Sequence, residues 1–264
     1  MAVFDSYVQG TPNWVELHTS DQQAAADFYA KVLGWGIDTT PISDDGDVYL
    51  IGHKDGDNIA GIAHLMTEIQ DHPPFWAVYL AADDVDAATA KVEAAGGKID
   101  MGPFDVMTFG RMSAVQDPSG ARINLWQAGD SIGSVRANEP GTPVWNELIT
   151  PEVEKALPFY AEVLGMGSEA SQMPIMPDGS TYMIVTDAEG RQVAGATTSP
   201  MPGLPPHWNV YFQVEDVDAT VAQVTDLGGT AIAPAFDVPG VGRMAMLADP
   251  QGATFWVMAA ADAA

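Results

Sequence analysis

The chain carries the same series of short motifs twice, 131 to 132 residues apart. Trp14-Val15-Glu16-Leu17, for example, returns as Trp145-Asn146-Glu147-Leu148. Along the chain, the other repeated motifs are Phe28-Tyr29 and Phe159-Tyr160, Val32-Leu33-Gly34 and Val163-Leu164-Gly165, Asp84-Val85-Asp86-Ala87 and Asp216-Val217-Asp218-Ala219, Gly110-Arg111-Met112 and Gly242-Arg243-Met244, and the Asp-Pro-x-Gly-Ala runs that begin at Asp117 and Asp249. A repeat of this length is that of a whole domain, far longer than the period of a solenoid. We therefore predict two similar domains, 1–128 and 142–264, joined by a linker at 129–141, a size that suits the 264 residues.

Each predicted domain divides again at a proline-bearing break, 68–74 in the first and 199–206 in the second. Each resulting unit opens with a β-rich run, such as 14–18, continues with a helical stretch and ends with two or three strands separated by turn signals. A right-handed crossover followed by antiparallel strands gives a curved mixed sheet with helices on its outer side. The sequence thus predicts an α+β fold of four βαβββ units, in which two units form a half-barrel with a free concave face.

Four helices are expected, two in each half. They are predicted at 21–33, from Thr150 to Gly165, at 84–95 and at 216–227. The first places its apolar residues on one side with a 3.6-residue period. Ser20 and Gln23 resemble a capping box at its start. For the equivalent helix of the second half, Thr150 is the expected cap and Pro151 suits the first helical position.

Composition limits the classes of partner. The formal charge of −26, from 36 acidic and 10 basic residues, argues against binding to phosphate backbones or anionic membrane surfaces. The lack of cysteine excludes disulfides, thiol nucleophiles and thiolate metal sites. Neither a signal peptide at 1–12 nor an apolar stretch of about 18 residues is visible. We therefore expect a cytoplasmic protein whose partner is a small molecule, not nucleic acid or a membrane. Its oligomeric state stays open.

The motifs together resemble the vicinal oxygen chelate superfamily. The resemblance rests on a helix ending in Phe-Tyr-x-x-Val-Leu-Gly, a strand–helix junction of the Asp-Val-Asp-Ala type, a Gly-Gly turn and a terminal hairpin with Asp-Pro-x-Gly-Ala. It covers about residues 11–128 and 142–259. The duplicated Gly-Thr-Pro openings are similar, more closely, to glyoxalase-like hydroxylase and antigen proteins of actinobacteria. The resemblance implies the fold. Function varies widely within the superfamily, so fold alone does not assign it.

Metal-dependent members of that superfamily hold a divalent ion on the concave face with His or Glu at three strand positions. Transferred to this chain, those positions are Trp14, Ala77 and Asn124 in the first half, and Trp145, Asn209 and Trp256 in the second. None of these side chains is a good ligand for a catalytic divalent ion. We therefore expect no metal cofactor. A displaced metal site of Glu147, His207 and Asn209 is the alternative, and a polar cap at a strand start is the simpler role for His207.

Repeated polar residues supply the candidates for chemistry without a metal. A carboxylate in an otherwise apolar strand needs a partner or becomes neutral. Glu16 and Glu147 are in that position and are predicted as general bases. The paired candidates for polarising a substrate oxygen are Tyr79 with Tyr211 and Arg111 with Arg243. Ordinary alternatives are a Glu–Arg ion pair inside each domain and tyrosines bonded to the backbone.

Tryptophans supply the candidate binding surface. Trp14, Trp145 and Trp256 occupy ligand positions and suit a flat or apolar molecule, unless they only fill the half-barrel. Asn124, Asn209 and His207 complete the candidate ligand-binding set. Trp76 and Trp208 have the opposite strand phase and are expected in the core. The sequence thus predicts binding of a carbonyl-bearing or aromatic molecule with acid–base chemistry of lyase, isomerase or hydroxylase type. The alternatives are a non-catalytic antibiotic- or metabolite-binding protein and a metal-dependent methylglyoxal-type lyase.

Overall fold

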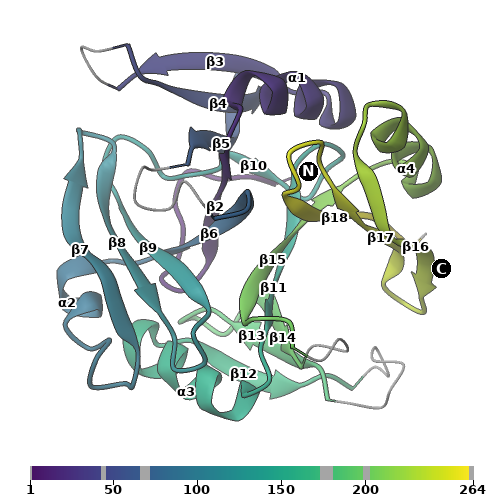
Figure 1. Cartoon of the computed structure of the whole chain (residues 1–264). Helices are drawn as coiled ribbons and strands as arrows, with labels where there is room; N and C mark the ends of the chain where they lie inside the picture. Colours follow the sequence, from purple (N-terminus) through teal and green to yellow (C-terminus); the bar gives the residue numbers. More distant parts are fainter. Residues whose placement is uncertain (1, 43–45, 66–71, 173–180, 199–202, 262–264) are drawn as a thin grey trace.

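The computed structural model describes residues 2–42, 46–65, 72–172, 181–198 and 203–261. Within them lie two open, eight-stranded mixed sheets, one in each half (Figure 1). A small antiparallel sheet pairs β1 (Ala2–Val3) with β10 (Arg136–Ala137). The predicted linker therefore contains a short strand that pairs with the N-terminal residues. None of the described helices is long and apolar enough to cross a membrane.

Both halves show the predicted order of elements, βαβββ twice over. The first half contains β2 (Pro12–Thr19), α1 (Gln22–Leu33), β3 (Gly36–Pro41), β4 (Val48–Lys54), β5 (Asp57–His64), β6 (Phe75–Ala81), α2 (Val85–Thr89), β7 (Lys98–Val106), β8 (Gly110–Gln116) and β9 (Arg122–Ala128). The second half contains β11 (Pro143–Ile149), α3 (Val153–Leu164), β12 (Gly167–Ala170), β13 (Met183–Thr186), β14 (Gln192–Thr197), β15 (His207–Gln213), α4 (Val217–Asp226), β16 (Thr230–Val238), β17 (Gly242–Ala248) and β18 (Thr254–Ala260). The predicted α+β fold class is confirmed. Parts of the predicted breaks at 68–74 and 199–206 lie outside the described residues.

The strand order is the same in both sheets. In the first half it is β3-β4-β5-β2-β6-β9-β8-β7, with β2 and β6 antiparallel at the centre. Each central strand also has a parallel neighbour, β5 for β2 and β9 for β6. The first strands of the two units therefore lie side by side, so the residues of β2 and β11 occupy the middle of their sheets.

Helix ends agree with the sequence only in part. Gly34 and Gly165 end α1 and α3 in the left-handed conformation, as glycine permits. The predicted cap Ser20 is wrong, because Asp21 accepts the hydrogen bond from the backbone N–H of Ala24.

The start of α3 and the end of α2 also differ from expectation, whereas α4 agrees with the helix predicted at 216–227. The Thr150 hydroxyl accepts from the N–H of Glu152, so it stabilises the turn before α3 rather than the helix start itself. The helix predicted at 84–95 is α2, which ends at Thr89 and continues as turns to the Gly-Gly pair.

Each half packs its first helix against the second unit of the other half. α1 lies beside α4, and α3 beside α2 (Figure 1). The Tyr29 hydroxyl of α1 donates to Asp249 at 3.1 Å, and the equivalent Tyr160 of α3 donates to Asp117 at 3.0 Å. Both aspartates also accept backbone N–H groups of their own Asp-Pro-x-Gly turn. The repeated turn motif therefore helps to join the two halves.

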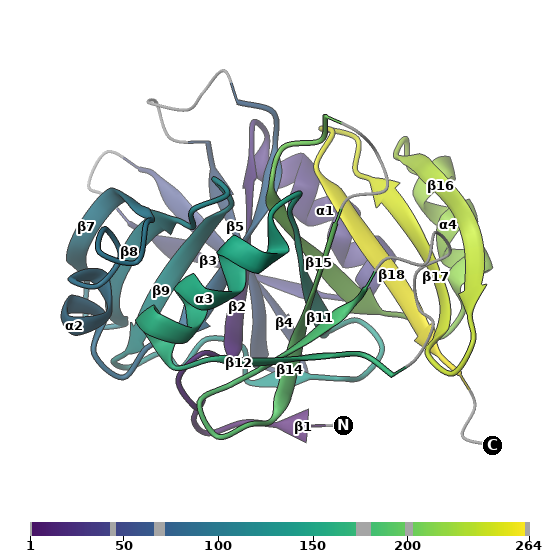
Figure 2. The ribbon, with the colours of Figure 1, turned by 90° about the horizontal axis from the view of Figure 1, so that it is seen from below.

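The main apolar core is shared by the two halves and lies on the helix side of both sheets. Phe212 of β15 is fully buried there, with its ring 5.6 Å from Trp35 and 5.1 Å from Trp76 of the other half. Trp76 and Trp208 occupy this core, as their strand phase predicts, and donate from Nε1 to the two helix tyrosines. The outer strands β7–β9 and β16–β18 lie on opposite sides of the molecule in Figure 2. The opposite face of each sheet is left for a site.

Candidate functional site

Strand alternation places the repeated Trp and Glu on the face turned away from the shared core. In β2, Val15 and Leu17 are core residues, so Trp14, Glu16 and His18 lie on the other face. The same alternation holds in β11. Both glutamates are 8% exposed, so they are largely buried but still reach the surface of this face.

Glu16 accepts three side-chain hydrogen bonds. The Tyr49 hydroxyl donates to Oε2 at 2.5 Å and the Tyr79 hydroxyl to Oε1 at 3.0 Å. His18 Nε2 lies 2.9 Å from Oε1 and makes an ion pair when protonated. Trp14 Nε1 donates to the Tyr49 hydroxyl at 3.1 Å, which fixes the direction in which that hydroxyl donates. The carboxylate is therefore held by His18 of its own strand β2, by Tyr49 of β4 and by Tyr79 of β6.

Glu147 has an equivalent pair of tyrosines, but Ile149 stands where the first half has His18. The Tyr211 hydroxyl donates to Oε2 at 2.9 Å, and the Tyr182 hydroxyl also hydrogen-bonds the carboxyl group. Trp145 Nε1 donates to Tyr182 at 2.9 Å, as Trp14 does to its tyrosine. Asn209 Nδ2 donates to Oε2 at 3.4 Å, where the first half has Ala77. Each half therefore has a carboxyl group held by two tyrosine hydroxyls.

A glycine opposite each glutamate makes this arrangement possible. Gly61 of β5 pairs with Glu16, and Gly195 of β14 pairs with Glu147. A Cβ atom at either glycine would lie 1.8 Å from the hydroxyl of Tyr49 or Tyr182. The tyrosine ring therefore crosses the intervening strand over the glycine and reaches the glutamate.

Tyr49 and Tyr182 were missed by sequence reasoning. The available signal was that both tyrosines repeat, in Val48-Tyr49-Leu50 and Thr181-Tyr182-Met183, and that Gly61 and Gly195 repeat after them. Nothing local shows that these segments face the glutamate, because a helix and a strand separate them from it in the sequence and the pairing is long-range.

The two carboxyl groups have opposite pKa shifts. Burial alone would raise the pKa of Glu16, but the hydrogen bond and charge of His18 and the bonds from Tyr49 and Tyr79 together lower it. Burial raises the pKa of Glu147, and the hydrogen bonds from its neutral donors, chief among them Tyr211, together with the charge of His207 offset burial only in part. The first-half carboxylate is thus stabilised in its charged form, whereas the second-half carboxyl group is poised to take up a proton.

Replacing Gly195 by Ala should displace the Tyr182 hydroxyl from Glu147, because the new methyl group occupies its place. Glu147 then loses a hydrogen-bond donor that stabilises its charged form, so we expect its pKa to rise further. Carboxyl-detected NMR of labelled glutamate measures the shift. Gly190→Ala is the control in the same half, because no atom lies within 4 Å of the added Cβ. Its positive φ adds local strain but no contact with Tyr182. An unchanged Glu147 titration in Gly195→Ala contradicts the assigned role of the glycine.

Aromatic and methionine side chains lie near Tyr211, which bonds the second-half carboxyl group. Trp256 stacks on Tyr211, with ring centroids 5.2 Å apart and planes 15° from parallel. Met246 of β17 pairs with Trp256, and Met258 lies two residues after Trp256 on β18. Both methionines are half-buried. Within the described part of the chain, the buried Nε1 of Trp256 has no hydrogen-bond partner. Half-buried apolar side chains thus lie on this sheet beside Trp256, which stacks on a tyrosine that bonds Glu147.

The remaining predicted binding residues fall on the same face. The Asn124 side chain hydrogen-bonds the Tyr79 hydroxyl in the first half. In the second half, His207 Nε2 lies 3.1 Å from Asn209 Oδ1, and His207 Nδ1 lies 2.8 Å from the carbonyl oxygen of Pro205. The predicted Tyr residues and Asn209 thus bond the glutamates directly, and the predicted Trp residues, Asn124 and His207 contact a tyrosine that bonds a glutamate or contact Asn209.

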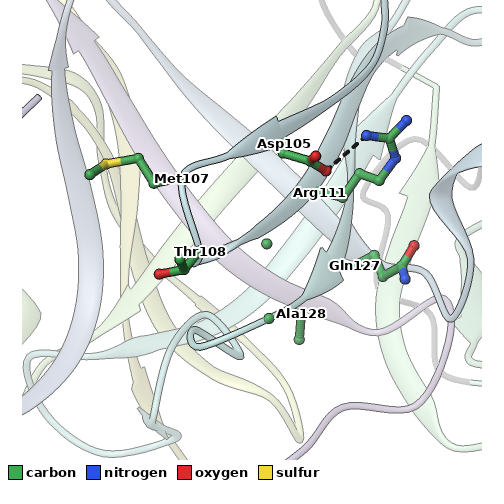
Figure 3. Close-up of a pocket in the computed structure, with 8 residues that line it drawn as sticks. Asp105, Met107, Thr108, Arg111, Gln127 and Ala128 are labelled. Carbon is green, nitrogen blue, oxygen red and sulfur yellow. Dashed lines mark hydrogen bonds and ion pairs between the residues drawn. The ribbon is translucent and has the colours of Figure 1, made fainter.

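The two arginines lie elsewhere. Arg111 bonds Asp86 at 2.6 Å. It also bonds Asp105 at 2.8 Å (Figure 3). Arg243 makes the equivalent ion pairs with Asp218 at 2.8 Å and Asp237 at 3.2 Å. The predicted Glu–Arg ion pairs are therefore wrong, and the structure does not bring either arginine to a glutamate.

Strand alternation explains the position of the arginines. Ser113 of β8 hydrogen-bonds Thr89 of α2, so Arg111, two residues before it, also lies on the helix side of the sheet. At the end of the hairpin, Arg111 borders an open surface cavity of about 260 Å³ together with Thr108 and Gln127 (Figure 3). The two aspartates bond the guanidinium on this side of the sheet, away from Glu16.

The donor set does not fit the divalent ion of the metal-dependent relatives. At the three family positions the structure presents Trp, Ala and Asn in one half and Trp, Asn and Trp in the other. Among the described residues, no group of three His, Asp or Glu side chains is placed to hold a metal ion. Glu147 and His207, candidates for a displaced site, are separated by Asn209, which hydrogen-bonds both.

Fold and site together define a duplicated βαβββ protein with a carboxyl–tyrosine centre on the free face of each sheet. A family model described as Glyoxalase/Bleomycin resistance protein/Dioxygenase superfamily matches residues 11–125 and 142–257. The chain belongs to this superfamily.

Among curated proteins, the chain is 44% identical over 253 residues to Putative glyoxylase CFP32 of Mycobacterium tuberculosis (strain CDC 1551 / Oshkosh), covering 96% of this chain and 95% of that protein. It is 36% identical over 265 residues to Anthracycline biosynthesis protein DnrV of Streptomyces peucetius, covering 96% and 94%.

Solved structures show the same fold at low sequence identity. The Mn(II)-bound glyoxalase from Novosphingobium aromaticivorans has a TM-score of 0.64 and 18% identity, with 96% of this chain and 83% of that chain covered. A catechol 2,3-dioxygenase has a TM-score of 0.62 and 14% identity, with 97% and 94% covered. At these identities the similarity concerns the fold alone.

Proposed function

We propose that the second half binds a small, flat, carbonyl-bearing organic molecule and that Glu147 moves a proton to or from it. The observation that carries this proposal is the buried Glu147 carboxyl group, whose pKa is raised by burial while two tyrosine hydroxyls hydrogen-bond it. A carboxyl group with a pKa shifted toward neutrality is suited to both accept and return a proton. The neighbouring Trp145 and Trp256 suit a flat ligand, and Trp256 Nε1 adds a donor.

The proposed step needs no oxidant or second reactant. The Glu147 carboxylate takes a proton from a carbon next to the ligand carbonyl, the C–H electron pair forms a C=C bond, and the carbonyl oxygen becomes an enolate. Once protonated, Glu147 accepts fewer hydrogen bonds, so the Tyr211 hydroxyl is free to donate to the enolate oxygen. Return of the proton to a different carbon completes an isomerisation, and loss of a leaving group from the enolate completes a lyase reaction. Neither outcome involves a metal ion.

The first half favours a second candidate function, binding without chemistry. His18 lies 2.9 Å from Glu16 and, with the two tyrosines, lowers the pKa of that carboxyl group, so it is a weak proton acceptor. The same face still offers Trp14 and Asn124 for contact with a ligand. Sequestration of an antibiotic or metabolite is thus the function that this half supports best.

The relatives support an aromatic ligand class. One of them is named as an anthracycline biosynthesis protein, and anthracyclines are flat polycyclic molecules with carbonyl groups. The apolar, Trp-bearing face around Glu147 has the chemistry to stack with molecules of this shape.

Titration with bicyclic and tricyclic aryl ketones that carry a C–H bond next to the carbonyl tests the proposal. We expect saturable quenching of tryptophan fluorescence and exchange of the neighbouring C–H for deuterium in D₂O, followed by ¹H NMR. Quenching without exchange would support binding of the ketone and contradict the proposed catalysis. Exchange that requires an added divalent ion would contradict the metal-independent step.

A further inference from the structure

A three-residue hydrogen-bond chain leads from Glu147 to the edge of the site in the second half. Asn209 Nδ2 donates to Glu147 Oε2 at 3.4 Å, and Asn209 Oδ1 lies 3.1 Å from His207 Nε2. Asn209 pairs with Glu147 across β11 and β15, and His207 is the next residue on the same face. Asn209 is 8% exposed, whereas His207 is half-buried and reaches solvent.

The donors and acceptors of this chain allow only certain protonation states. The carbonyl oxygen of Pro205 can only accept, so His207 Nδ1, 2.8 Å away, carries a hydrogen. With Asn209 Oδ1 facing it, His207 Nε2 must also carry a hydrogen, which makes the imidazole a cation. Asn209 Nδ2 then donates to a Glu147 carboxylate. In this first state His207 is charged and Glu147 is ionised.

Rotation of the Asn209 amide by half a turn gives a second satisfied state. Asn209 Nδ2 then donates to a neutral His207 Nε2, and Asn209 Oδ1 accepts from a protonated Glu147. Both states hold one proton, on His207 in the first and on Glu147 in the second. A neutral His207 beside an ionised Glu147 places two acceptors against each other at one end of Asn209, whichever way the amide points. That combination is therefore disfavoured.

We propose that Asn209 couples the protonation of Glu147 to that of His207, so that the two groups share one proton and titrate as a pair. His207 and Asn209 are thus positioning residues that act through Glu147, and they set the pH range in which Glu147 is ionised. The functional consequence rests on the proposed role of Glu147 as a base, whereas the coupling itself does not.

Other groups around the chain do not replace this coupling. The titratable side chains that contact Glu147 from neighbouring strands in the described part of the protein are Tyr182 and Tyr211, whose raised pKa values keep them neutral. The first half is a natural comparison, because Phe75 and Ala77 stand where His207 and Asn209 do. The chain therefore belongs to the second half alone.

NMR of the whole protein, with ¹³C-carboxyl glutamate and ¹⁵N-imidazole labels, tests the coupling without any ligand. Signals are assigned by Glu147→Gln and His207→Phe. In the wild-type protein we expect the Glu147 and His207 signals each to show the same two inflections with pH, as coupled sites do. His207→Phe should raise the pH midpoint of Glu147 by about one pH unit, because a neighbouring cation is lost. The Glu16 signal is the internal control and should not move.

Asn209→Ala, which introduces the first-half residue, should give one independent inflection for each group. It should also reduce the effect of His207→Phe on Glu147 by more than half. Independent single inflections in the wild-type protein would overturn the proposal, and that measurement needs no variant to fold. An equal effect of His207→Phe with and without Asn209 also overturns it, since the charge would then act through space. Coupled titration of Glu147 and His207, with no deuterium exchange in any of the ketones, would support the coupling and contradict the proposed catalysis.

Discussion

Replacing Glu147 by Gln is expected to lower the rate of deuterium exchange into a bound aryl ketone by about 10²–10⁴-fold, the usual contribution of a general base. Gln keeps the size of the side chain and can still accept from Tyr211, so the face that binds the ligand should persist. Exchange measured by ¹H NMR at saturating ketone gives the change in kcat, and fluorescence quenching gives the affinity. We expect the affinity to change far less than kcat.

Glu16→Gln is the matched control in the other half. Because Glu16 is held ionised by His18, its replacement should leave exchange at the second site within a few-fold. An equal loss of exchange in both variants, or full exchange in Glu147→Gln, would show that Glu147 is not the base.

The pH dependence of exchange has a defined sign. A base acts in its ionised form, so kcat/KM should rise as pH rises through the pKa of Glu147, which burial raises above the ordinary value for Glu. The same shift affects stability in the opposite direction, since the folded state holds that proton more tightly than the unfolded state. The contribution of Glu147 is fully present below its unfolded pKa and is lost as pH rises through its folded pKa. For Glu16, whose pKa is lowered, the contribution is present above the unfolded pKa and is lost as pH falls through the folded pKa.

Replacing Phe212 by Ala should lower the free energy of unfolding by about 3–5 kcal/mol, as for other large buried aromatic residues. Phe212 is fully buried in the core that joins the halves and contacts Trp35 and Trp76 across the boundary. A cavity at this position should weaken both halves together, because the apolar core on the helix side of each sheet contains residues of both halves. Urea unfolding followed by circular dichroism measures the change.

Phe104→Ala is the control for loss of an aromatic ring on a strand. Phe104 is 37% exposed at the edge strand β7, so its replacement should change the free energy of unfolding by well under 1 kcal/mol by the usual behaviour of exposed positions. Similar stability of the two variants would contradict the stabilising role assigned to the shared core. Unfolding of Phe212→Ala in two steps, with the same total free energy of unfolding as the wild-type protein, would contradict it as well.

Much of the fold was predictable because its signals are local. The 3.6-residue period of α1 and the glycines that end α1 and α3 depend on neighbouring residues only, and the structure confirms them. The cap at Asp21 instead of Ser20 shows the usual limit of one residue, since either side chain can accept the same backbone hydrogen bond. The short α2 was not predicted: it ends at Thr89 and the chain continues as turns, whereas the equivalent α4 spans Val217–Asp226.

The candidate site was predictable in part. Alternation along a strand places Trp14 beside Glu16 on one face, and duplication repeats this in Trp145 and Glu147. The predicted Glu–Arg ion pair was wrong because Arg111 lies on the face of β8 that packs against α2, where Asp86 bonds it. The sequence does not show which face of β8 meets that helix.

The sequence by itself determined the duplication, the βαβββ order and the residues on the face of each first strand, because repeats and strand alternation are properties of neighbouring positions. Only the tertiary structure decided that Tyr182 reaches Glu147 over Gly195, and that Tyr49 reaches Glu16 over Gly61. These contacts depend on which strands lie side by side. Burial and donor number, which set the two pKa shifts in opposite directions, exist only once those strands have paired.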